Sequence, residues 1–147
     1  MNLAKHSRVS NSDDHSLLDQ IETIYYSRKA VLGVVGMGYV GLPLALAAAG
    51  AKYRVIGFDI DPKKVDRINS GNSYLKHIGS EQIARAVNEK KLRATADFQE
   101  AKVVDAVIVC VPTPLTANRE PDLSFVEHTA EAIAPYLQKG QLVVLES

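Results

Sequence analysis

Residues 31–59 read VLGVVGMGYVGLPLALAAAGAKYRVIGFD, in which a glycine-rich turn connects two apolar segments, the second ending in an acid. The run at 31–35 is short and rich in valine, as in buried strands, and GMGYVG follows it directly at 36–41. In this pattern Gly36 permits a sharp turn off the strand, Gly38 lets the backbone approach a pyrophosphate, and Gly41 lets the next helix pack on the strand. The N-terminus of that helix offers free N–H groups and a positive dipole to phosphates. The segment therefore predicts a dinucleotide-binding site, the alternative being a turn that keeps this geometry and binds nothing.

The acid that ends the segment distinguishes between two related cofactors. Asp59 follows Gly41 by 18 residues, close to the spacing of this fingerprint. A carboxylate there can accept hydrogen bonds from both adenosine ribose hydroxyls and repels a 2′-phosphate, which favours NAD over NADP. Lys64, one helical turn further on, can reach the adenosine end of a bound nucleotide. The alternatives are a solvated carboxylate at the end of a strand and a solvated lysine.

Bulk composition excludes several classes of function. A chain of 147 residues with 46% hydrophobic residues is the size of one domain with its own core. Its 17 basic and 17 acidic residues cancel, so the sequence has no excess positive charge that would attract nucleic acid or an anionic membrane. The four histidines do not have the spacing of metal ligands. The single cysteine, Cys110, lies in an apolar run without a basic neighbour, which predicts a buried core residue and not a nucleophile. We expect no metal, and a cytoplasmic protein, because the sequence has neither a secretory signal nor a run near the ~20 apolar residues of a membrane span.

Apolar periodicity divides the chain into a leader, a helix and one α/β domain. Residues 1–13 are polar and predict a mobile leader, whereas 14–29 predict an amphipathic helix that covers a sheet edge or faces a partner subunit. In 30–147, strands alternate with helices, which predicts a Rossmann-type, doubly wound, mainly parallel sheet in the order 3-2-1-4-5. The predicted strands are 31–35, 55–58, 92–95, 105–111 and 142–145. The predicted helices are 42–49, 62–70, 80–91 and 123–137, and the last three are expected to be capped by Asp61, Ser80 and Asp122.

The segment after the fourth predicted strand holds another candidate ligand contact. In Val111-Pro112-Thr113-Pro114 the two prolines fix their own φ angles and favour extended backbone before them, so Thr113 is held stiffly. Strands one and four diverge at this end of a doubly wound sheet, and ligands lie in the crevice between them. Thr113 is therefore a candidate contact to the nicotinamide half of the cofactor, or else a turn hydroxyl.

Several motifs in fixed order resemble one family. They are GMGYVGLPLA at 36–45, IGFDIDP at 56–62, VPTPL at 111–115, EPD at 120–122, IAPYL at 133–137 and VLES at 144–147. Together they resemble the N-terminal NAD-binding domain of the UDP-glucose and UDP-N-acetylhexosamine 6-dehydrogenases, and VPTP and EPD resemble the members that oxidise UDP-N-acetylglucosamine or UDP-N-acetylmannosamine. The competing interpretations are a non-catalytic, nucleotide-sensing regulatory module, such as the NAD-binding domains that gate potassium transport, and, less well matched, a methyltransferase that binds S-adenosylmethionine at the same turn.

The resemblance implies a reaction and a set of cofactor contacts. The family oxidises the C6 alcohol of a UDP-sugar to a uronic acid by two hydride transfers to NAD, through an aldehyde held on a cysteine, and works as a homo-oligomer. Because the family's catalytic groups would follow Ser147, the resemblance implies a truncated cofactor domain without catalytic residues. We expect it to bind NAD weakly and to oxidise nothing by itself. The cofactor contacts expected here are Gly36, Met37, Gly38, Tyr39, Val40, Gly41, Asp59, Lys64, Thr113 and Ser147.

Overall fold

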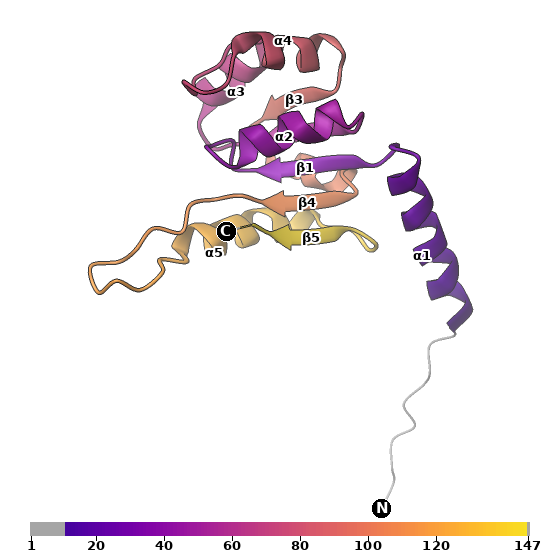
Figure 1. Ribbon diagram of the computed structural model, residues 1–147. Helices are drawn as coiled ribbons and strands as arrows, with labels where there is room; N and C mark the ends of the chain where they lie inside the picture. The colour runs from indigo at the N-terminus through magenta and orange to yellow at the C-terminus, as the bar shows by residue number, and fades with distance from the viewer. Residues whose placement is uncertain (1–10, 147) are drawn as a thin grey trace, which may run out of the picture.

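The computed structural model describes residues 11–146 and contains one five-stranded parallel sheet (Figure 1). The strands lie in the order β3-β2-β1-β4-β5, which confirms the predicted topology. The elements in chain order are α1 (Asn11–Tyr26), β1 (Val31–Val35), α2 (Gly41–Gly50), β2 (Arg54–Phe58), α3 (Pro62–Asn69), α4 (Ser80–Asn88), β3 (Leu92–Thr95), the 3₁₀ helix η1 (Phe98–Val103), β4 (Ala106–Val109), α5 (Ser124–Ile133), the 3₁₀ helix η2 (Ala134–Tyr136) and β5 (Leu142–Leu145).

Helices cover both faces of the central strands. On one face, α2, α3 and α4 bury Leu42, Ile68 and Ile83 against β1, β2 and β3. On the other face, η1 and α5 bury side chains against β1, β2 and β4. Strands enclosed on both sides are expected to be apolar along most of their length, and apart from Arg54 at the start of β2 this holds for β1, β2 and β4. In the register, Val35 of β1 lies beside Phe58 of β2 and Val109 of β4, so the carboxyl ends of these three strands are level.

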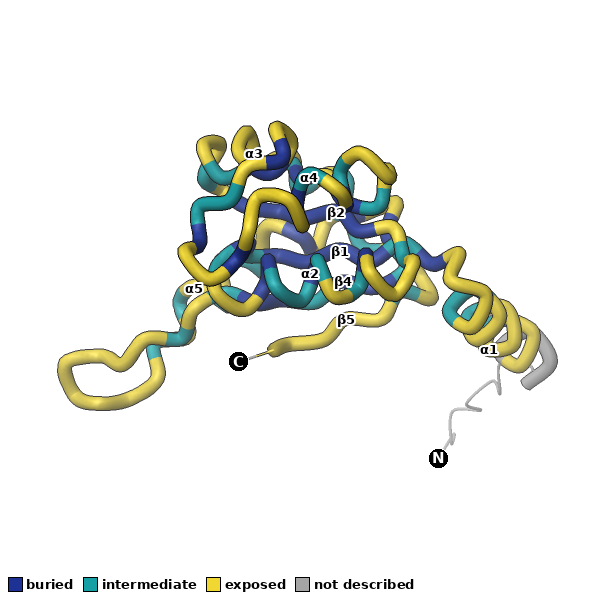
Figure 2. Tube along the Cα trace, turned by 45° about the horizontal axis from the view of Figure 1, so that its top comes forward, coloured by how far each residue is buried: buried dark blue, intermediate teal, exposed yellow. Residues whose placement is uncertain are grey.

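Two elements lie at the margins of this core. Figure 2 shows the buried residues along β1, β2 and β4, whereas β5 and most of α1 are exposed. All four β5 side chains are apolar and between 36% and 54% exposed. The C-terminal turn of α1 is attached to the body through Tyr25, whose carbonyl accepts a hydrogen bond from the Tyr53 hydroxyl at 3.0 Å, while the Arg28 guanidinium lies over the Tyr53 ring.

Several element boundaries differ from those predicted. Residues 11–13, expected in the leader, belong to α1, and 1–10 lie outside the described residues. The helix expected to continue to Leu137 ends at Ile133, because Pro135 has no N–H and its ring clashes with the preceding turn. Phe98–Val103 forms a 3₁₀ helix that was not predicted, and β4 ends at Val109 instead of Val111.

The predicted helix caps were right in one case and displaced in two. Asp61 caps α3, because its carboxylate oxygen Oδ1 accepts a hydrogen bond from the Lys63 N–H at 2.9 Å. Ser80 is not the cap of α4, because Gly79 occupies that position and the Ser80 hydroxyl instead accepts from the Ser73 N–H at 2.9 Å. Asp122 lies one residue before the cap position of α5, although its carboxylate accepts from the Ser124 N–H at 3.0 Å.

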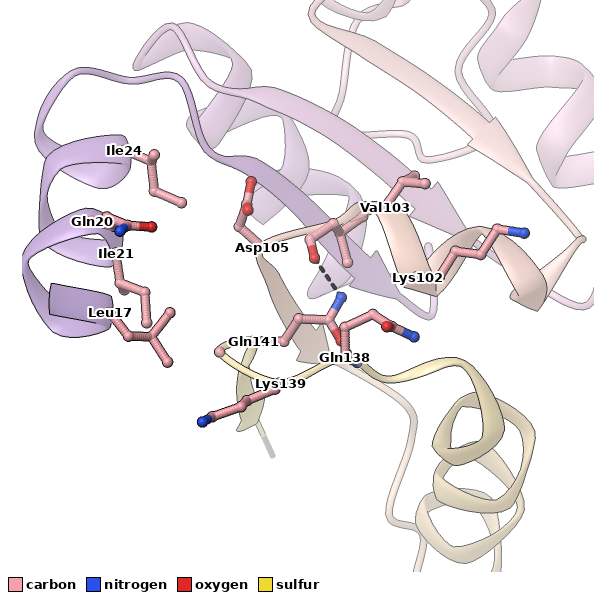
Figure 3. A pocket seen from close by; sticks show the side chains of 12 residues that line it. Leu17, Gln20, Ile21, Ile24, Lys102, Val103, Asp105, Gln138, Lys139 and Gln141 are labelled. Carbon is pink, nitrogen blue, oxygen red and sulfur yellow. Dashed lines mark hydrogen bonds between the residues drawn. The ribbon is translucent and has the colours of Figure 1, made fainter. Parts of the chain in front are cut away.

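A hollow of about 280 Å³ separates α1 from the start of β4 and the 138–141 loop (Figure 3). Apolar side chains of α1 line one wall, and Gln141 in the opposite wall donates to the carbonyls of Ala101 and Val104. Asp105 precedes β4 and Gln141 precedes β5, so this hollow lies at the amino ends of the strands. The predicted ligand crevice belongs at their carboxyl ends.

Candidate cofactor-binding site

Two glycines of the turn after β1 are required by the packing of the protein itself. Gly36 has φ +90°, and a Cβ there would lie 2.8 Å from the carbonyl oxygen of Cys110. A Cβ at Gly41 would lie 1.8 Å from the carbonyl oxygen of Gly36, because the first turn of α2 packs directly on this loop. These contacts confirm the sharp turn and the close helix packing expected of the fingerprint.

Gly38 has no such internal reason to be glycine. Its φ lies outside the left-handed region, and an added Cβ would meet no described residue within 4 Å. Within residues 11–146, the N–H groups of residues 38–41 donate to no acceptor. The middle of the turn therefore combines open space with free donors at the N-terminus of α2, as a pyrophosphate requires.

Asp59 lies at the end of β2 and is only 5% exposed. One carboxylate oxygen, Oδ2, accepts from the Met37 N–H at 2.9 Å and pairs with the Lys64 ammonium at 3.2 Å. The other, Oδ1, accepts from the Asp61 N–H at 2.9 Å. A carboxylate accepts about four hydrogen bonds, so the structure leaves one position, on Oδ1, for a ribose hydroxyl. A second ribose bond requires the Lys64 ammonium to move.

The loop between α3 and α4 contacts the same turn, which the sequence did not predict. The Tyr74 hydroxyl donates to the Met37 carbonyl at 2.5 Å. The rings of His77 and Tyr39 stack with their centroids 5.7 Å apart. Burial, reinforced by the carboxylates of Asp59 and Asp61, raises the pKa of the Tyr74 hydroxyl, which keeps it a neutral donor. The only hint in the sequence is that this loop is partly apolar.

The structure brings together only part of the predicted set of contacts. Residues 36–41, Asp59 and Lys64 form one cluster at the carboxyl ends of β1 and β2. Thr113 is half-buried and follows by three residues Cys110, whose carbonyl packs against Gly36. Ser147 lies outside the described residues. The contacts of these residues with a cofactor remain a prediction.

A metal site, a membrane span and a cysteine nucleophile each have structural requirements with which the described residues can be compared. In the part of the chain that the structure describes, no group of histidine, cysteine and carboxylate side chains is arranged to hold a metal ion. No described helix has the length and apolar character needed to cross a membrane. Cys110 is 7% exposed, and burial together with the Glu146 carboxylate raises the pKa of its thiol, which disfavours the thiolate that a nucleophile needs.

A parallel sheet of this order, with a glycine turn leading into α2 and an acid at the end of β2, defines a Rossmann-type nucleotide-binding domain of the kind found in dehydrogenases. The sequence model of the UDP-glucose/GDP-mannose dehydrogenase family, NAD binding domain, matches residues 30–147. The chain therefore belongs to this family and is its NAD-binding domain.

Individual relatives agree with this assignment. The chain is 45% identical over 117 residues to an NDP-N-acetyl-D-galactosaminuronic acid dehydrogenase of Ralstonia nicotianae, covering 79% of this chain and 27% of that protein. It is 43% identical over 119 residues to the UDP-N-acetyl-D-mannosamine dehydrogenase of Escherichia coli K12, covering 80% and 28%. The crystal structure of NDP-N-acetyl-D-galactosaminuronic acid dehydrogenase from Methanosarcina mazei Go1 superimposes with a TM-score of 0.74 at 34% identity, covering 86% and 30%. The chain thus spans under a third of the length of these relatives.

Proposed function

We propose that this chain binds NAD across the carboxyl ends of β1, β2 and β4. The pyrophosphate would lie against the free N–H groups of residues 38–41, the adenosine ribose at Asp59, and the nicotinamide toward Thr113 and Ser147. The observation that carries this proposal is the open space at Gly38, since no contact within residues 11–146 requires a glycine there. The free position on the Asp59 carboxylate supports the orientation of the adenosine half.

We propose further that the domain serves a dehydrogenase of UDP-N-acetylhexosamines, with UDP-glucose as the alternative substrate. The named substrates of the relatives, UDP-N-acetyl-D-mannosamine and an NDP-N-acetylhexosamine derivative, support the N-acetylated sugars. NAD supplies a hydride acceptor, and oxidation of the C6 alcohol to a uronic acid takes two such transfers. The proposed enzyme works as a homo-oligomer. Family membership favours this dehydrogenase function over a nucleotide-sensing regulatory module.

The 147-residue chain by itself is proposed to bind the cofactor without turning over a sugar. Cys110, the one cysteine in the sequence, is buried behind the glycine turn, and its thiol is disfavoured as a thiolate. It therefore cannot hold an aldehyde intermediate as a thiohemiacetal without unfolding of the surrounding core.

Calorimetric titration of the purified chain tests the proposal. We expect NAD to bind, NADP to bind more weakly because its 2′-phosphate approaches Asp59, and S-adenosylmethionine not to bind. Incubation with NAD and UDP-N-acetylglucosamine, UDP-N-acetylmannosamine or UDP-glucose should produce no NADH absorbance. Absence of NAD binding, or tighter binding of S-adenosylmethionine, would contradict the cofactor assignment, and NADH formation would contradict the proposed inactivity.

A further inference from the structure

We propose that Tyr74 is a positioning residue that locks the Met37–Gly38 peptide in the orientation that binds the cofactor's pyrophosphate. This inference rests on the proposed NAD binding at the glycine turn. Tyr74 lies 37 residues from Met37 in the sequence, on a loop that carries none of the predicted cofactor contacts. Its hydroxyl acts through the backbone of the turn.

The residue before Gly38 is held on every side. The Met37 N–H donates to the Asp59 carboxylate at 2.9 Å, and its carbonyl accepts from the Tyr74 hydroxyl at 2.5 Å. The Met37 side chain is fully buried and packs on Gly57, where an added Cβ would lie 2.7 Å from the methionine sulfur. Met37 is therefore a fixed point from which the turn continues.

The peptide that follows Met37 joins its carbonyl to the N–H of Gly38. Because the peptide is planar and trans, these two groups point in opposite directions. The Tyr74 hydroxyl holds the carbonyl on its own side, so the Gly38 N–H points away from Tyr74. That N–H is one of the free donors of the turn.

Because position 38 is a glycine, the orientation of the preceding peptide is not fixed by the backbone alone. Without a Cβ, the backbone at Gly38 adopts alternative φ values at little cost, so the preceding peptide can flip. A flipped peptide would present the Met37 carbonyl oxygen, a negative dipole end, to the pyrophosphate in place of an N–H. The hydrogen bond from Tyr74 favours the productive orientation while leaving Gly38 open to the ligand.

The loop that carries Tyr74 is rigid enough to act as an anchor. Leu75 and Ile78, on either side of the exposed His77, are buried in the core beneath α2 and α4. At the start of the loop, the Ser73 N–H donates to the Ser80 hydroxyl at the first turn of α4. The position of the Tyr74 hydroxyl is therefore supported by the packing of its own loop on the core and by the contact with α4, in addition to the loop's contacts with the glycine turn.

The test compares Tyr74→Phe with Tyr53→Phe by calorimetric titration of NAD, ADP and adenosine. Both variants keep the ring and remove a hydroxyl that bonds to a backbone carbonyl, but Tyr53 lies at the amino ends of the strands. We expect Tyr74→Phe to weaken NAD and ADP by about three- to tenfold, the net value of one hydrogen bond, and to leave adenosine unchanged. Tyr53→Phe should bind all three ligands as the unaltered chain does.

Amide NMR spectra of the free proteins provide a second readout. Tyr74→Phe should shift or broaden the Gly38 resonance, whereas Tyr53→Phe should leave it unchanged. The role of Tyr74 would be overturned if Tyr74→Phe bound NAD as tightly as the unaltered chain, or if it weakened adenosine and NAD equally. An unchanged Gly38 resonance would also overturn it. If the unaltered chain bound none of the ligands, the proposed function would fail, and the Gly38 resonance would still decide whether Tyr74 orients the peptide.

Discussion

Replacing Gly38 with alanine should separate cofactor binding from folding. The added methyl group meets no atom of residues 11–146 within 4 Å, and the φ angle lies outside the left-handed region that favours glycine, so we expect no strain in the folded state. Alanine also reduces the conformational entropy of the unfolded chain, which stabilises a protein by about 0.4–1 kcal/mol. For a domain of this size the melting temperature should rise by about 1–4 °C.

The same methyl group would occupy the space that the proposed pyrophosphate approaches. We expect Gly38→Ala to weaken NAD by about tenfold or more, which corresponds to 1.4 kcal/mol or more. The measurement pairs thermal unfolding, followed by circular dichroism, with calorimetric titration of NAD. A variant that is more stable than the unaltered chain and yet binds NAD less tightly cannot be explained by loss of structure.

Two other glycines provide matched controls. Gly50, at the far end of α2, also has nothing within 4 Å of an added Cβ, so Gly50→Ala should raise stability and leave NAD affinity unchanged. Gly41→Ala would force its Cβ against the Gly36 carbonyl and should destabilise the fold by at least about 1–3 kcal/mol. Unchanged NAD affinity of Gly38→Ala would refute the placement of the pyrophosphate, as would an equal loss in Gly50→Ala.

Three further perturbations test the charges and the thiol. Lys64→Met should weaken NADP more than NAD in calorimetric titrations, because the ammonium beside Asp59 offsets repulsion of a 2′-phosphate; equal effects on both would contradict this. The hydrogen bond from Arg93 lowers the pKa of Glu100, so Arg93→Met should cost less than about 1 kcal/mol at pH 7. That difference should vanish as the pH falls through the lowered pKa, below 4.5, and a pH-independent difference in urea unfolding would refute it. Cys110 should react with Ellman's reagent at pH 8 only after denaturation, and rapid reaction of the folded chain would show that the thiol is accessible.

Features written into short stretches of sequence were predicted well. The strands follow from alternating apolar runs, and their order follows from the doubly wound fold that the glycine turn and the acid at the end of β2 indicate. The Asp61 cap of α3 was also predicted, because aspartate followed by proline at the first helical position specifies both backbone angles and the cap bond. Such features depend on residues only a few positions apart.

Features that depend on distant residues were not predicted. The contact of Tyr74 with Met37 exists only because the α3–α4 loop folds back over the turn. The hydrogen bond from the Met37 N–H to Asp59 likewise joins residues 22 positions apart, and it occupies one of the acceptor positions of the carboxylate. The exposure of β5 could not be deduced from its apolar sequence, since the same pattern fits a strand with helices on both sides.

The outer strand of the sheet affects how the purified domain will behave. The N–H groups of Leu142 and Glu146 point inward to the carbonyls of Asp105 and Val109. The alternation of a strand therefore turns the main-chain groups of Val143 and Leu145 outward, between apolar side chains that are about half exposed. An exposed apolar edge strand of this kind can pair with strands of other molecules, and β5 contains no lysine or proline, the residues that commonly prevent such pairing. Concentrated samples will tend to aggregate through this strand, so light scattering should accompany the ligand titrations.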